Sequence, residues 1–232
     1  VLFDVGQDRL RLAATNGVAL GVADSRIVSR SGGFLGKIFL SLPDARMLKK
    51  AISDCAKEPH FKFSSGSVGI FTDDTEIFAR SSMFAFPKFE DILERAKSLF
   101  FITFSVSLPD LCNCLRLMRL SLAVVEKKKE KGKAKVAPLE TAITARIDGG
   151  RLLLSGEDQI FGAEARVDLP LLSVEKADSC SFVIGIDLLD EILRLFPAGV
   201  AQFYLNKSGH LLLTWQGKDG FYFIQAARTM DL

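Results

Sequence analysis

The hydrophobic and polar positions of the chain repeat one unit, in which an apolar run leads directly into an amphipathic helical pattern. The run 38–40 is followed by Ser41-Leu42-Pro43-Asp44, and the run 101–106 is followed by Ser107-Leu108-Pro109-Asp110. Proline suits the first helical turn, and aspartate complements the helix N-terminus. A weaker third copy passes from 182–186 into 187–193. Repetition of one unit predicts an architecture built by duplication.

Short segments of alternating apolar and polar residues follow each helical pattern. Turn residues such as Gly149-Gly150 separate these segments. Alternation of this kind is typical of antiparallel sheets with one solvated face. The recurring order of one strand, one helix and three strands therefore predicts an α+β fold, with antiparallel sheets covered by helices on one face.

The pattern predicts the following elements. Helices are expected at 43–54, 110–125 and 187–196, and residues 86–90 are expected to form a linker. Strands are expected at 1–5, 10–14, 20–22, 36–40, 60–64, 67–72, 76–81, 101–107, 142–148, 152–157, 163–169, 181–185, 201–206, 210–216 and 220–226. The first unit lacks its opening strand and helix, so we expect a partial domain over 1–97 and a complete domain over 98–232.

Composition and cysteine spacing narrow the class of protein. Hydrophobic residues make up 48% and charged residues 25% of the chain, as in soluble globular proteins. No apolar run reaches membrane-spanning length, and no secretory signal opens the sequence. Four cysteines, Cys55, Cys112, Cys114 and Cys180, lack metal-ligand spacing. We expect reduced thiols, a cytoplasmic location and no metal or other cofactor.

Charge is distributed unevenly. The net charge is +2, but residues 126–135 contain six lysines and two glutamates and so carry +4, which leaves −2 for the remainder. Any attraction for nucleic acid must therefore be local.

Three segments resemble the DNA sliding clamps, and in detail the beta clamps of bacterial DNA polymerase III. The segment 10–20 is similar to the strand that ends in Thr-Asp-Gly-His-Arg-Leu in that family. Residues 84–89, Phe-Ala-Phe-Pro-Lys-Phe, are similar to its Gly-Arg-Phe-Pro-Asp-Tyr, and 226–232 to its C-terminus ending in Met-Arg-Leu. In the terms of the family, the chain would be the second half of the middle domain followed by the third domain.

The resemblance implies a DNA-clamp fold with sheets outside and helices lining the inner face. It also implies a processivity factor, and not an enzyme, that encircles duplex DNA without sequence preference. In the first helix Arg46, Lys49 and Lys50 share a face opposite the apolar face of Leu48, Ala51 and Ile52. In the second helix Arg116 and Arg119 lie opposite the apolar stripe of Leu111, Leu115, Met118 and Leu122. Lysines 127 to 129 form part of the basic segment and could also reach phosphate; the DNA-binding candidates are therefore Arg46, Lys49, Lys50, Arg116, Arg119, Lys127, Lys128 and Lys129.

The third helix does not follow this pattern, because Asp187, Asp190 and Glu191 outweigh Arg194. Each basic group could also be an ordinary solvated helix face, and the lysine-rich segment an ordinary solvated loop.

The resemblance also implies an apolar pocket that receives peptide tails of the polymerase and the clamp loader. Carried over by position, its wall comprises Thr15, Gly17, Leu20, Pro87, Ile92, Met230 and Leu232. The chain departs from the family at Val18-Ala19, Asp91 and Asp231, which removes arginines and adds acids. These departures should weaken attraction for acidic tails.

Two other functions stay open. A clamp-fold interaction protein could bind partner peptides without encircling DNA; the incomplete first unit, the acidic third helix and the altered pocket favour it. A small enzyme would need a convergent polar site, and neither His60 nor His210 has a partner at catalytic or metal spacing. A homo-oligomeric ring would require the missing N-terminal region, and a nucleoid-associated location follows from the clamp reading.

Overall fold

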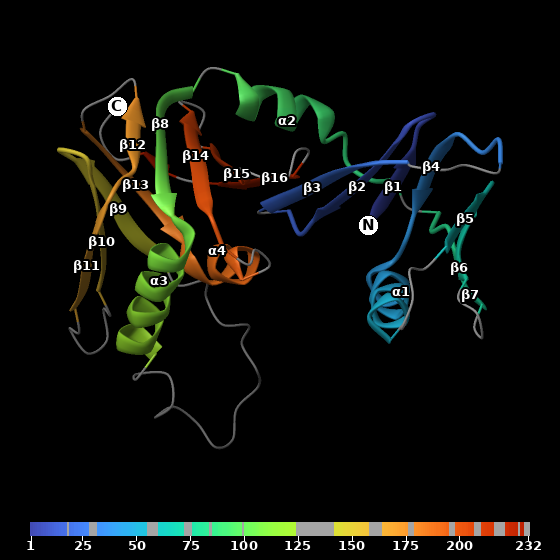
Figure 1. The fold of residues 1–232 in the computed structure, drawn as a ribbon, viewed down its shortest axis with the longest axis horizontal. Coiled ribbons are helices and arrows are strands. Elements are labelled where there is room, and N and C mark those ends of the chain that lie inside the picture. Colours follow the sequence, from blue (N-terminus) through green and yellow to red (C-terminus); the bar gives the residue numbers. More distant parts are fainter. Residues whose placement is uncertain are drawn as a thin grey trace. The chain divides into compact units, whose positions relative to one another are not determined.

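The computed structural model describes residues 1–17, 19–27, 32–54, 60–71, 76–83, 85–98, 100–123, 142–157, 164–175, 179–194, 198–206, 210–215, 221–226 and 228–229. These residues form two compact units, Val1–Phe89 and Glu90–Leu232. Each unit is built from antiparallel strands and helices (Figure 1). The expected α+β class is therefore confirmed.

The first unit contains one helix and two groups of strands. Four strands pair in the order β3-β2-β1-β4, and three pair as β5-β6-β7. The bounds are β1 Leu2–Val5, β2 Arg9–Thr15, β3 Ala19–Arg26, β4 Gly36–Phe39, α1 Leu42–Asp54, β5 His60–Ser64, β6 Ser67–Phe71 and β7 Glu76–Arg80.

The core of this unit lies between α1 and the two groups of strands. Alternate residues of β6 and β7 point toward α1, so that Val68, Ile70 and Ala79 are buried with Leu48 of the helix and Ile38 of β4. Burial of these side chains fixes which face of α1 is turned inward, because Leu48 lies at the centre of its apolar stripe.

The second unit has two five-stranded groups and three helices. Its strands pair in the orders β12-β8-β14-β15-β16 and β11-β10-β9-β13-β17. The bounds are α2 Glu90–Lys97, β8 Phe100–Ser107, α3 Leu108–Ala123, β9 Ala142–Asp148, β10 Arg151–Glu157, β11 Glu164–Pro170, β12 Ser173–Glu175, β13 Ser179–Gly185, α4 Ile186–Leu193, β14 Val200–Asn206, β15 His210–Trp215, β16 Phe221–Ala226 and β17 Arg228–Thr229.

Helices α3 and α4 lie side by side over the inner faces of these strands (Figure 1). The helix α3 packs against β8, β10 and β11. Its predicted apolar stripe is confirmed, since Leu111, Leu115, Met118 and Leu122 are all buried. The side chains at 116, 117 and 120 are consequently turned to solvent.

The three predicted helices and the predicted strands are present within the described residues, with small shifts at their ends. The pattern missed α2, β12 and β17. Residues 90–97 are mostly charged and follow a proline, a pattern that indicates a linker and a return to the next strand. Contacts of α2 with β14 and β15 place this helix in the second unit, whereas the expected division at 97/98 placed it in the first.

Candidate nucleic-acid interface

The exposed side of α1 carries three cations together with apolar residues, since Met47 and Ile52 are 41% and 39% exposed. Ile52 was expected on the apolar face, but Leu48 is the buried residue of this helix. Arg46, Lys49 and Lys50 are exposed, whereas Leu48 is 2% exposed on the opposite side. The helix starts where Ser41 caps it: the Asp44 amide donates to Ser41 Oγ at 3.3 Å, and the Ser41 hydroxyl donates to Asp44 Oδ2 at 2.6 Å. Within the helix, about 3.6 residues per turn bring positions 46, 49 and 50 to one face. We name Arg46, Lys49 and Lys50 the α1 basic face.

The exposed side of α3 carries fewer cations than that of α1. Arg116 is exposed as expected, but Leu117 and Leu120 are 56% and 58% exposed beside it. Residues three apart on a helix are neighbours, so the two leucines form one apolar patch. The sequence predicted Arg116 and Arg119 on the exposed side. The two exposed leucines were missed, although their spacing from the buried stripe identifies them.

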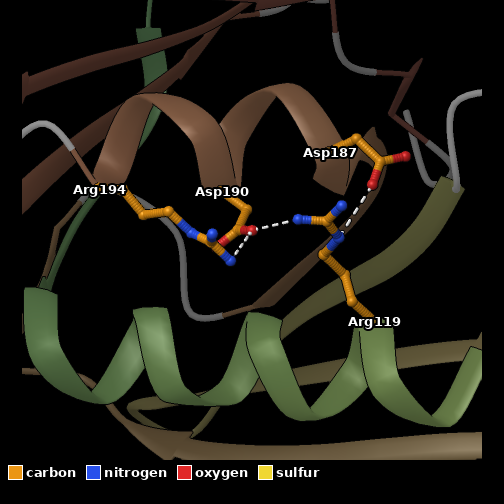
Figure 2. Close-up of polar contacts among 4 residues, drawn as sticks. All are labelled: Arg119, Asp187, Asp190 and Arg194. Carbon is orange, nitrogen blue, oxygen red and sulfur yellow. Dashed lines mark hydrogen bonds and ion pairs between the residues drawn. The ribbon is translucent and has the colours of Figure 1, made fainter. Parts of the chain in front are cut away.

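Arg119 contacts α4 across the gap between the two helices, as Figure 2 shows. Its Nε lies 3.1 Å from Asp187 Oδ1, and its Nη1 donates to Asp190 Oδ2 at 2.5 Å. Arg194 reaches the same carboxylate, with Nη2 2.7 Å from Asp190 Oδ2. Two arginines therefore bind the Asp190 carboxylate, which is buried at 1% exposure.

The electrostatics of this four-residue group, which we name the α3–α4 charge cluster, are balanced. Arg119, Arg194, Asp187 and Asp190 carry two positive and two negative charges. The hydrogen bond to Asp190 raises the pKa of Arg119 above its usual value, and the charges of Asp187, Asp190 and the nearby Glu191 add to this effect. The acidic character of α4, an exception in the sequence pattern, thus compensates arginines beside it. Arg116 is the other basic residue of α3.

Other candidates of the DNA-facing group lie outside the described residues. These are Lys127, Lys128 and Lys129. Their contact with phosphate stays a prediction.

The pocket residues are described in part. Thr15, Gly17, Leu20 and Pro87 belong to the first unit, Ile92 belongs to the second, and Met230 and Leu232 lie outside the described residues. The Thr15 hydroxyl donates to the carbonyl of Ala19 at 2.7 Å, and the Gly17 amide donates to Thr15 Oγ1 at 3.1 Å. Gly17 has φ +90°, which favours glycine at this turn between β2 and β3. The pocket itself stays a prediction.

A shallow hollow of about 550 Å³ lies on the sheet β11-β10-β9-β13. It is lined by Thr144, Arg146, Leu153, Leu154, Ser155, Arg166, Val167, Asp168 and Ser181. The two arginines that line it form ion pairs with neighbouring acids, Arg146 with Asp148 and Arg166 with Glu164. Among the described residues, no three histidine, cysteine, aspartate or glutamate side chains are grouped as a metal site.

No helix in the described part of the chain has the length and apolar character needed to cross a membrane.

Comparisons with known proteins identify the fold. Neither a scan of protein-family models nor a search of curated proteins finds a match. Among solved structures, the DNA polymerase III beta subunit of Thermotoga maritima superposes with a TM-score of 0.79 at 15% identity, over 100% of this chain and 57% of that one. The beta subunit from the DNA polymerase of Streptococcus pyogenes gives 0.79 at 12% identity, over 99% and 57%.

A third structure, the DNA polymerase sliding clamp of Bacillus subtilis, gives 0.79 at 10% identity, over 100% of this chain and 56% of that one. The chain therefore has the fold of the bacterial sliding clamps, and the resemblance stated from the sequence is confirmed at that level. It spans a little over half the length of these structures.

Proposed function

We propose that this chain acts as part of a DNA sliding clamp, a non-catalytic processivity factor that encircles duplex DNA and tethers a polymerase. The observation that carries the proposal is the α1 basic face: on a clamp fold, the helix turns Leu48 into the core and three cations outward. Cytoplasmic, nucleoid-associated location and assembly into a homo-oligomeric ring belong to the same proposal.

The chemistry of the α1 basic face suits this task. Lysine and arginine contacts to phosphate are independent of base sequence and weaken with salt, as a sliding protein requires. The proposed duplex contacts come from Arg46, Lys49, Lys50 and Arg116, with Arg119 and lysines 127 to 129 as further candidates. The proposed peptide pocket would hold apolar side chains of polymerase or clamp-loader tails.

A second function has its own support. The patch of Leu117 and Leu120 is apolar, and the α3–α4 charge cluster is neutral, on the side of α3 that a clamp would turn toward DNA. Both features would suit a clamp-fold interaction protein that binds partners without encircling a duplex.

The experiment compares retention on circular and linear DNA. The full-length protein that contains this chain is loaded on a nicked circular duplex, separated by gel filtration, and then challenged by linearising the DNA. A ring is retained on the circle and released from the linear form. Retention that does not depend on DNA topology would contradict encirclement and favour the second function.

Variants of the α1 basic face test the proposal quantitatively, through the salt dependence of DNA affinity. Replacing Arg46, Lys49 and Lys50 by glutamine should reduce the slope of log affinity against log salt by about 2 to 3, because each lost phosphate contact removes about 0.9. The control variant replaces Lys62 and Arg80, two exposed cations on the face of the β5-β6-β7 strands opposite Val68. An equal loss in both variants would remove α1 from the interface.

A further inference from the structure

In the α3–α4 charge cluster, the N–H donors of Arg119 are bound by carboxylates and not left for a phosphate. Two of the three guanidinium nitrogens are engaged, Nε with Asp187 and Nη1 with Asp190. A guanidinium binds carboxylate and phosphate through the same planar set of N–H groups. A phosphate that took these donors would therefore have to displace carboxylates that are part of the protein.

The two acids hold Arg119 in different ways. Asp190 is 1% exposed and also bound by Arg194, so losing Arg119 would leave a buried carboxylate with one arginine partner fewer. Removing one partner from a buried charge is costly. Asp187 is 35% exposed and lies at 3.1 Å, so its attraction for Arg119 competes directly with solvent and with any anion that approaches the helix.

We propose that Asp187 and Asp190 compete with DNA phosphate for Arg119, and that Asp187 limits the affinity of the α3–α4 side for the duplex. This inference rests on the proposed clamp function. The α1 basic face then makes the stronger, salt-sensitive contacts, and the α3 side contributes chiefly Arg116. A protein surface whose arginines are already paired with its own carboxylates can move along DNA without binding each phosphate tightly.

The choice of Asp187 as the tunable residue follows from burial. Replacing Asp190 changes a side chain that two arginines hold inside the protein, so any effect on DNA would be mixed with an effect on stability. Replacing Asp187 by asparagine keeps the shape at the start of α4, removes one charge, and leaves the pair of Asp190 with Arg194 in place.

The test measures equilibrium affinity of the full-length protein for a fluorescent linear duplex across a salt series. Asp187→Asn should raise affinity about 3- to 10-fold at low salt, and should steepen the salt slope by about 0.9, the value for one added phosphate contact. Adding Arg119→Gln to Asp187→Asn should remove the gain. Arg119→Gln alone should leave the slope unchanged.

The matched control is Glu175→Gln, which raises net charge by the same amount at an exposed position of β12. If Glu175→Gln gives the same gain, the effect is general charge and the inference is overturned. It is also overturned if Arg119→Gln alone lowers the slope by about 0.9, because Arg119 then already contacts phosphate.

The α1 variants described above separate this inference from the proposed function. If they weaken binding while Asp187→Asn changes nothing, the clamp proposal stands and the competition between acids and phosphate is overturned. If neither changes binding, the nucleic-acid interface itself is overturned. Thermal unfolding of each variant verifies that the folded protein is being compared.

Discussion

At the scale of single residues, Gly156 sets how closely α3 can approach the strand beneath it. A β-carbon at this position would lie 2.8 Å from Leu122 Cδ1 and 3.2 Å from Ile143 Cγ2. The helix that carries Arg116 and Arg119 therefore rests directly on the backbone of β10.

We predict that Gly156→Ala lowers the free energy of unfolding by about 1 kcal/mol, because the added methyl group forces the side chains of Leu122 and Ile143 to shift. The measurement is urea unfolding monitored by circular dichroism. Gly21→Ala is the control, since a β-carbon at Gly21 meets no atom within 4 Å. Equal stability of the two variants would show that α3 can shift without cost.

The thiols of α3 give a pH-dependent prediction. Burial raises the pKa of Cys112, and the charge of Asp190 adds to the effect; burial likewise raises the pKa of Cys114. The folded protein therefore keeps these thiols protonated at pH values where the unfolded chain ionises. Their contribution to stability is present below the ordinary thiol pKa of 9.0 and is lost as the pH rises above it.

We accordingly expect slow alkylation of both thiols in the native state near pH 8, because the thiolate is the reactive form. Iodoacetamide labelling followed by peptide mass spectrometry would measure it, with the protein in denaturant as the reference. Native labelling as fast as labelling in denaturant would contradict the raised pKa values.

At the scale of elements, the first turn of α1 depends on one serine. Ser41 accepts from the Asp44 amide and donates to its carboxylate, so it satisfies one of the amides that the helix itself cannot pair. The cap is part of the Ser-Leu-Pro-Asp repeat that the sequence shows twice.

We predict that Ser41→Ala destabilises the first unit by about 1 kcal/mol, the usual value of an N-cap serine. Chemical denaturation would measure the loss. Ser53→Ala is the matched control, because the Ser53 hydroxyl is exposed and donates to the Lys49 carbonyl within the same helix. A loss as large for Ser53→Ala would mean that the cap is not the cause.

At the scale of the whole molecule, the proposed peptide pocket gives the clearest prediction. A fluorescent peptide carrying the leucine and phenylalanine anchors of a polymerase tail should bind, and Ile92→Ser should weaken it about 10-fold by removing apolar contact area. Fluorescence anisotropy is the measurement. Leu172→Ser is the control, since Leu172 is an exposed apolar residue of the second unit outside the proposed pocket. Equal weakening in both variants would exclude Ile92 from the pocket.

The fold could be predicted largely because its signals are local. The Ser-Leu-Pro-Asp repeat marked where α1 and α3 begin, and the spacing of Leu111, Leu115 and Met118 identified the buried side of α3. The helix α2 was missed because its apolar stripe is short, with Leu93 and Ala96 buried among charged residues, and because its contacts with β14 and β15 are distant in sequence.

One part of the candidate interface could be predicted from the sequence, and another part could not. The basic face of α1 followed from spacing within one helix, since helical phase relates Arg46, Lys49 and Lys50 directly. The ion pairs of Arg119 could not be predicted in this way. Its partners Asp187 and Asp190 lie about 70 residues away along the chain, and helix spacing relates only residues within one helix.

The sequence by itself determined the class of fold, the places where the three main helices begin and the buried side of α3, because periodicity and capping act over a few residues. Only the tertiary structure decided which charges compensate one another. Pairing of Arg119 with Asp187 and Asp190 depends on how α3 and α4 pack together, and electrostatic energy depends on distance in space and on burial, neither of which spacing along the chain can supply.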